Sequence, residues 1–148
     1  MLEQIKQFFG AYWQNLRNNT EITSVDPAEM KTMLNELCEH NELLDEKYRT
    51  CDYKQMKNIV SIIPSKSRVY ISQDRDCEDF AWEFKAIAKS VFPNLPIGYV
   101  HVETPQGKHA MNCCFYYSGN NLRFALIEPQ TGKMYNSIAN YEPYLILI

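Results

Sequence analysis

The stretch from Gln73 to Trp82 most constrains the fold, because it places a cysteine at the predicted start of an amphipathic helix. The apolar positions that follow recur at three- and four-residue spacing, which is typical of a helix with one buried face. They are Phe80, Ala81, Phe84, Ile87, Ala88 and Val91. Asp76 is a good N-cap residue, and Asp79 follows three residues later, as in a capping box. The pattern therefore predicts that Cys77 is the first residue of a helix.

A cysteine at a helix N-terminus is suited to nucleophilic chemistry. The unpaired backbone N–H groups and the positive end of the helix dipole favour a thiolate, the form of cysteine that attacks carbonyls. Four carboxylates nearby oppose a further negative charge: Asp74, Asp76, Glu78 and Asp79. The nucleophile hypothesis therefore requires a compensating cation, either Arg75 or an imidazolium. The alternative is that Cys77 is a small buried hydrophobe of a packing helix.

Length and composition predict one globular domain over residues 1–148. The chain has 148 residues, 45% of them hydrophobic, which is enough for one substantial core. A net charge of −3 gives no general electrostatic reason to bind nucleic acid or an anionic membrane. A mixed amino terminus and an odd count of five cysteines without regular spacing favour a cytoplasmic, reducing location.

The first half of the chain, residues 1–64, is predicted to be mainly helical. An aromatic-rich apolar stripe runs from Leu2 to Leu16 and favours packing against the domain, with docking to a partner as the alternative. Asp26 and Pro27 supply an N-cap and a first-turn proline for a second helix. Its expected buried side is Met30, Met33, Leu34, Leu37, Leu44 and Tyr48. The run from Ile59 to Ile63 fits either a helix end or a short buried strand, and Val69–Ile71 fits a brief extended segment.

The second half, residues 97–148, is predicted to form antiparallel strands. Pro93 and Pro96 stop helical structure. Segments rich in β-branched and aromatic residues then alternate with turn residues. The predicted strands are 97–103, 109–117, 122–128 and a last one at 144–148, covered on both faces. The expected class is α+β, with the helix that carries Cys77 packed on an antiparallel sheet.

His109 and Glu128 are the predicted partners of Cys77. A cysteine nucleophile needs a base within hydrogen-bond reach and a third group that orients the base. His109 begins one strand and Glu128 ends the next, so a hairpin joined at 118–121 makes them one cross-strand pair. Taken singly, each also fits an exposed residue at a strand end. His101, in mid-strand, is the rival base and fits a packed or exposed strand histidine, whereas His40 is expected to be solvated.

The remaining polar residues give weaker signals. Gln73, together with the backbone N–H of Cys77, is the candidate oxyanion donor, although Gln73 equally fits a loop residue. Asn112 alternates to the opposite strand face from His109 and is not assigned to the triad. Cys113 and Cys114 should point to opposite faces of one strand, so the cysteines and histidines do not predict a metal site. No cofactor is predicted either.

Four short blocks resemble transglutaminase-like cysteine proteins of bacteria and their phages, within the papain-like peptidase superfamily. They are Asp76–Ala81, Gly98–Val100, His109–Asn112 and Leu126–Gly132, and the resemblance covers roughly residues 69–135. It implies a papain-like fold with Cys77 as nucleophile, His109 as general base and acid, and Glu128 as the orienting carboxylate. Met111 stands where many relatives have tryptophan, and Glu128 replaces the commoner aspartate.

Two functions are consistent with these residues. The first is a cysteine-dependent amide hydrolase or acyl transferase that acts on a protein or peptide substrate through a thioester. The second is an inactive papain-like binding module, such as a phage protein that engages a host protein through the aromatic stripe at Leu2–Leu16.

Overall fold

The structure is a computed structural model that describes residues 3–4, 7, 10–11, 14–15, 22–63 and 76–148. Its helices with defined bounds are α2 (Pro27–Leu37), α3 (Tyr53–Ile62) and α4 (Cys77–Val91). Its strands are β1 (Thr23–Val25), β2 (Asn41–Glu42), β3 (Tyr48–Thr50), β4 (Ile97–Thr104), β5 (Gly107–Ser118), β6 (Asn121–Glu128), β7 (Lys133–Tyr135) and β8 (Glu142–Leu147). The predicted α+β class is confirmed at this level. Within these ranges, every helix is too short or too polar to traverse a bilayer.

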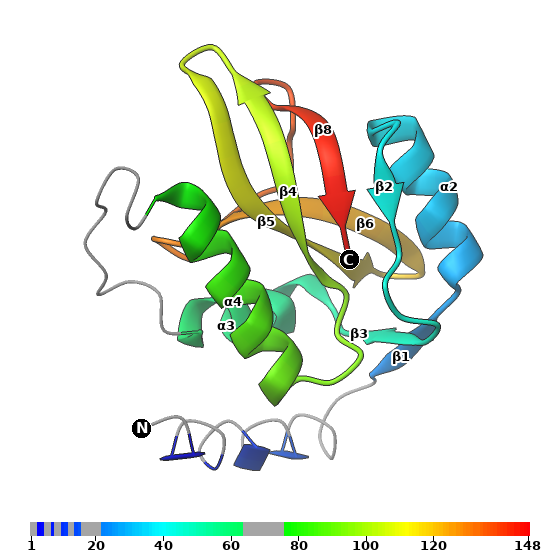
Figure 1. Ribbon diagram of the computed structural model, residues 1–148. Coiled ribbons are helices and arrows are strands. Elements are labelled where there is room, and N and C mark those ends of the chain that lie inside the picture. Colours follow the sequence, from blue (N-terminus) through cyan, green and yellow to red (C-terminus); the bar gives the residue numbers. More distant parts are fainter. Residues whose placement is uncertain (1–2, 5–6, 8–9, 12–13, 16–21, 64–75) are drawn as a thin grey trace.

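A six-stranded sheet forms the centre of the molecule, in the order β2-β8-β4-β5-β6-β7 (Figure 1). Its neighbouring strands are antiparallel except for the parallel pair β2 and β8. The two predicted hairpins are confirmed: Thr104 pairs with Gly107, and Ser118 pairs with Asn121. The short strands β1, β2, β3 and β7 were not predicted, because segments of two or three residues carry no detectable alternation.

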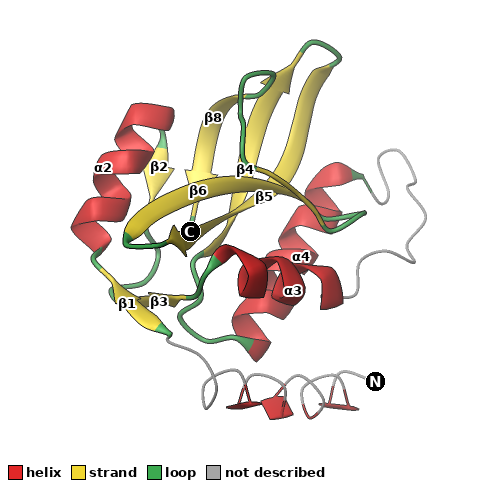
Figure 2. Cartoon of the chain, turned by 180° about the vertical axis from the view of Figure 1, so that it is seen from behind, coloured by secondary structure: helices red, strands yellow, loops and turns green. Residues whose placement is uncertain are grey.

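Helices cover both faces of this sheet. One core joins α3 and α4 to a sheet face that includes Ile97, Cys114 and Ile127. The other joins α2 to the opposite face, which includes Val100, Cys113 and Ile146. Figure 2 shows α2 beside β2, away from α3 and α4. Cys113 and Cys114 thus face opposite sides as predicted, because side chains alternate along a strand.

The second predicted helix is shorter than expected. It begins with Asp26 as N-cap and Pro27 in the first turn, as predicted, but it ends at Leu37. The expectation that its buried side continues to Leu44 and Tyr48 is wrong: Leu44 is 54% exposed, and Tyr48 lies in β3. Cys38 is the C-cap with an extended backbone, and the chain beyond it pairs with β8 at Asn41, whose amide donates to the carbonyl of Cys38.

Other expectations are resolved or lie outside the described residues. The ambiguous run at 59–63 continues α3 to Ile62. The last strand is β8, which lies between β2 and β4 with Ile146 fully buried. The apolar residues of the stripe from Leu2 to Leu16 and the segment Val69–Ile71 belong to the residues that the structure does not describe, as does Gln73.

Candidate active site

Cys77 is the first residue of α4, as predicted. Asp76 caps the helix, and its carboxylate accepts a hydrogen bond from the N–H of Glu78 at 3.1 Å. The carboxylate of Asp79 accepts in return from the N–H of Asp76 at 3.1 Å, which completes the capping box. Because Cys77 opens the helix, its own N–H has no acceptor within α4. The helix start therefore presents a thiol together with a backbone donor that α4 itself leaves unpaired.

The Cys77 thiol lies at a break in the sheet. The pairing between β5 and β6 runs from Ser118 and Asn121 to Asn112 and Ile127, and stops there. Beyond it, the N–H of Ala110 donates to Cys77 Sγ, with nitrogen and sulfur 3.4 Å apart. The sulfur thus accepts a hydrogen bond from an N–H of β5, beyond the point where β5 and β6 are paired.

Cys77 is the one cysteine of the five that is not buried. Burial raises the pKa of Cys51 and of Cys113 to about 12, and it also raises the pKa of Cys114. These three thiols are therefore protonated at neutral pH and inaccessible. Accessibility to solvent separates Cys77 from them.

His109 and Glu128 are hydrogen-bonded to each other. His109 Nε2 lies 2.8 Å from Glu128 Oε2, and both side chains are largely shielded from solvent. The other carboxylate oxygen, Oε1, accepts from the N–H of Gln130 at 3.2 Å. The backbone carbonyl of Glu128 accepts from the N–H groups of Thr131 and Gly132 in the same turn. The turn after β6 therefore holds the carboxylate toward the imidazole.

The predicted neighbourhood of these two residues is present, but the predicted register is wrong. Continuing the β5–β6 register would place Glu128 opposite Met111 rather than opposite His109. The ladder stops before either position, and the side chains meet across the opening where the strands diverge. A directly opposite pair would have required hydrogen-bonded strands up to His109.

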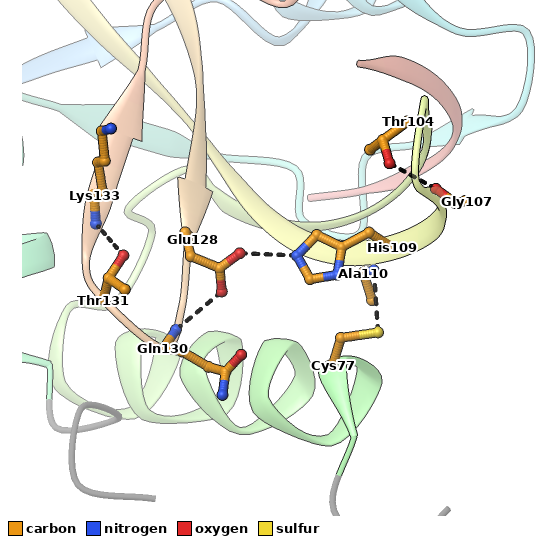
Figure 3. A network of polar contacts seen from close by, with 9 residues as sticks. All are labelled: Cys77, Thr104, Gly107, His109, Ala110, Glu128, Gln130, Thr131 and Lys133. Atoms are coloured by element: carbon orange, nitrogen blue, oxygen red, sulfur yellow. Dashed lines mark hydrogen bonds and ion pairs between the residues drawn. The ribbon is translucent and has the colours of Figure 1, made fainter. Parts of the chain in front are cut away.

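Figure 3 shows the His109 ring between the Glu128 carboxylate and Cys77. Nε2 points to Glu128, and the second ring nitrogen lies on the side of Cys77. Ala110, which follows His109 in β5, brings its N–H to the sulfur. Three elements, α4, β5 and the end of β6, thus bring the three predicted site residues to one place.

The rival base, His101, lies in a different set of contacts. Its Nε2 is 3.3 Å from Glu78 Oε1 and also meets the hydroxyl of Tyr99. Its ring packs against Tyr99 and Tyr144 with centroid distances of 5.0 and 5.4 Å. His101 is thus a packed strand histidine, as expected, and His40 is exposed, as expected.

Sequence reasoning missed two residues that shape the site. Asn112 is fully buried, and its amide donates to the carbonyls of Ala81 and Gly98, each at 2.9 Å, which ties α4 to β4. Tyr99 packs with Ala81 and Ala110 beside Cys77. Burial raises the pKa of Tyr99, and the charges of Glu78 and Cys77 raise it further. Alternation along β4 and β5 could have placed both side chains under α4, but it could not show these bonds.

A cleft of about 660 Å³ opens beside the His109–Glu128 pair. It is lined by residues 104–109 of the β4–β5 hairpin and by Glu128, Asn140 and Tyr141. It gives solvent a route to the imidazole and carboxylate. Among the described residues, no group of three or more His, Cys, Asp or Glu side chains is arranged to hold a metal ion.

Comparisons with known proteins find likeness in structure. No protein-family model matches the chain, and no curated protein matches it in sequence. The solved structure of a PSL1a–E64 complex is 25% identical with a TM-score of 0.69, covering 84% of this chain and 51% of that one. A Polyporus squamosus lectin bound to the human-type influenza-binding epitope Neu5Acα2-6Galβ1-4GlcNAc is also 25% identical, with a TM-score of 0.66 and coverages of 84% and 49%. The chain thus spans about half the length of these two proteins.

A further neighbour is LapG of Legionella pneumophila, in its EGTA-treated form. It is 12% identical with a TM-score of 0.45, covering 97% of this chain and 79% of that one. That likeness is too slight to bear on function.

Proposed function

We propose that the chain is a cysteine-nucleophile amide hydrolase or acyl transferase with a papain-like domain, in which Cys77, His109 and Glu128 form the catalytic triad. The observation that carries the proposal is the position of the His109 ring, which is bonded to Glu128 through Nε2 and faces Cys77 with its other nitrogen. A base held between a nucleophile and an orienting carboxylate is the arrangement that thiol catalysis needs.

Each residue has a defined part in the reaction. His109 takes the thiol proton, and the Cys77 sulfur attacks the carbonyl carbon of an amide. His109 then gives that proton to the departing amine as the C–N bond breaks, leaving a thioester. Water, deprotonated by His109, attacks the thioester, and the proton that it loses returns to the sulfur, releasing the acid and the free thiol. A second amine in place of water gives a new amide.

The surroundings of Cys77 support this chemistry. The carboxylates of Asp76 and Asp79 accept from backbone N–H groups of the helix start, and that of Glu78 faces His101. These partners and the imidazolium of His109 offset the acidic neighbourhood that opposes a thiolate. The N–H of Cys77 is the proposed oxyanion donor. The role of Gln73 as a second donor stays a prediction.

The likeness to the PSL1a–E64 complex adds support and supplies a reagent. E64 is an epoxide, which a nucleophilic thiolate opens to form a stable thioether. We expect E64 to add once, at Cys77, as mapped by peptide mass spectrometry. Cys77→Ala should abolish the adduct and His109→Ala should slow its formation by about tenfold or more. His40→Ala, which removes an exposed histidine between α2 and β2, is the matched control and should leave the rate unchanged.

An adduct that forms as fast in His109→Ala as in the wild type would sink the triad proposal. So would an adduct spread over other cysteines, because the proposal rests on one activated thiol.

A binding role without catalysis is the second candidate, and the likeness to the P. squamosus lectin favours it. The glycan in that structure is the ligand to test first, by calorimetric titration of the wild type and of Cys77→Ala. Binding that is equal in both proteins, combined with no E64 adduct, would establish the binding module. The triad proposal predicts the adduct whether or not the glycan binds.

A further inference from the structure

A row of ring contacts runs beside Cys77, on the side of α4. Trp82 of α4 stacks on Tyr99 of β4 with centroids 4.1 Å apart and planes 12° from parallel. The row continues from Tyr99 to His101 at 5.0 Å and from His101 to Tyr144 of β8 at 5.4 Å. We call Trp82, Tyr99, His101 and Tyr144 the aromatic wall. The catalytic scheme leaves this wall without a role.

Trp82 is the exposed end of the wall. It is 46% exposed, and among the described residues only Leu44 is another large hydrophobic residue exposed to this degree. The near-parallel stack on Tyr99 covers one face of the indole. The wall is also close to the sulfur, because Tyr99 packs in the same cluster as Cys77, Ala81 and Ala110. A substrate whose carbonyl meets Cys77 can therefore reach Trp82 with a neighbouring side chain.

The charge at the wall is complementary to a cation. Glu78 lies one helical turn before Trp82, so both occupy the same strip of the α4 surface. The Glu78 side chain is 57% exposed, and His101 holds it at 3.3 Å. At the other end of the wall a cation already lies against an aromatic ring: Lys108 Nζ is over the Tyr144 ring, 5.5 Å from its centroid.

The exposed Trp82 ring and the Glu78 carboxylate together favour one kind of substrate side chain. An aliphatic side chain would stack on Trp82 but would cover the Glu78 carboxylate without pairing with it. An acidic side chain would meet Glu78 with like charge. A guanidinium does both tasks, because it is planar, stacks on aromatic rings and pairs with carboxylates through two N–H groups.

We propose that Trp82 and Glu78 form a subsite for an arginine side chain of the substrate, next to the acyl group that Cys77 attacks. The inference rests on the proposed function, since it names the substrate class of the same site. Its recognition elements lie on α4 and β4, outside the triad.

E64 provides a matched test, because it carries a guanidinium group and an analogue exists in which an isopentyl group replaces the guanidine-bearing chain. We expect wild-type Cys77 to react about tenfold faster with E64 than with the analogue. Glu78→Gln and Trp82→Leu should each bring that ratio close to one, while Glu36→Gln, an exposed charge loss on α2, should leave it unchanged. Iodoacetamide, which has no side chain to recognise, should alkylate Cys77 at similar rates in the wild type, Trp82→Leu and Glu36→Gln. In Glu78→Gln it reports the change in thiol reactivity that follows from loss of the neighbouring charge, and this change cancels in the ratio of the two epoxide rates.

A ratio near one in the wild type, or a ratio that survives both substitutions, overturns the subsite and leaves the triad standing. Failure of the triad is seen separately, as alkylation that does not depend on His109.

A binding measurement keeps the inference testable even without reactivity. In the double variant Trp13→Phe, Cys77→Ala, Trp82 is the remaining tryptophan of the two in the chain. N-acetylarginine amide should change its fluorescence in a saturable way, and N-acetylleucine amide should not. Equal responses to the two amides would overturn the subsite.

Discussion

His109 Nε2 and Glu128 Oε2 lie 2.8 Å apart across the point where β5 and β6 separate. Beyond the last β5–β6 pair, the turn at 128–132 holds Glu128 through bonds from Gln130, Thr131 and Gly132. The same separation frees the N–H of Ala110 for Cys77.

Glu128→Gln tests whether this carboxylate orients the imidazole. The glutamine side chain has the same shape but no charge, so it no longer stabilises an imidazolium. We expect the rate of E64 addition to fall by about tenfold or more, with thermal stability close to that of the wild type. Glu36→Gln serves as the control for charge loss. An unchanged rate in Glu128→Gln would remove Glu128 from the triad.

Asn112→Asp should destabilise the fold more than Asn112→Ala. The buried amide donates to the carbonyls of Ala81 and Gly98, and an aspartate would turn an oxygen toward both. We expect losses of about 2–4 kcal/mol for alanine and more for aspartate, measured by urea unfolding. Equal losses of unfolding free energy in the two variants would mean that the Asn112 side chain contributes by packing alone, and not by donating hydrogen bonds to the two carbonyls.

Gly98→Ala should also destabilise the fold. A Cβ at this position would lie 2.7 Å from the backbone oxygen of Leu147 and 2.8 Å from Cys113 Sγ, so β8 or β4 would have to shift. The expected cost is about 1–3 kcal/mol in the free energy of unfolding. Gly119→Ala is the comparison. Gly119 has a positive φ of 59° and no atoms within 4 Å of the added Cβ, so this variant introduces backbone strain without overpacking. A tolerated Gly98→Ala would contradict the close approach of β4 and β8.

The free energy of unfolding should fall as the pH rises above the ordinary pKa of a cysteine thiol. Burial raises the pKa of Cys51 from 9.0 to about 12, so the folded state holds a proton that the unfolded state releases. The contribution is fully present below pH 9.0 and is lost as the pH rises toward about 12. Between these values one such thiol changes the free energy of unfolding by up to about 1.4 kcal/mol per pH unit.

Urea unfolding across this alkaline range measures the effect. Cys51→Ala should show a shallower decline with pH than the wild type, while Cys77→Ala, which removes the accessible thiol, should keep the wild-type slope. An identical decline in Cys51→Ala and the wild type would contradict the assignment of this proton to Cys51.

Local signals predicted the start of α4 and the hairpins, because capping residues and turn residues act on their immediate neighbours. Asp76 and Asp79 fixed the helix start, and the turn at 118–121 fixed the order of β5 and β6. The register at Glu128 could not be predicted, since it depends on where a ladder stops. The end of α2 at Leu37 was not predicted, because the chain just beyond it pairs at Asn41 with β8, more than 100 residues away in the chain.

The main features of the site that could not be predicted from the sequence are contacts between distant segments. The stack of Trp82 on Tyr99, the pair of Glu78 and His101, and the N–H of Ala110 at Cys77 all join α4 to β4 or β5. Periodicity assigns each residue to a face of its own element, but it does not determine how far a helix slides along a sheet.

The pH dependence of Cys77 alkylation tests the central claim most directly. The rate with iodoacetamide is followed by peptide mass spectrometry in the wild type, His109→Ala and the control His40→Ala. If His109 takes the thiol proton, alkylation at about pH 7 should be tenfold or more faster in the wild type and His40→Ala than in His109→Ala, and the rates should converge in alkali. Superimposable profiles for all three proteins, each following an ordinary thiol titration, would contradict the account.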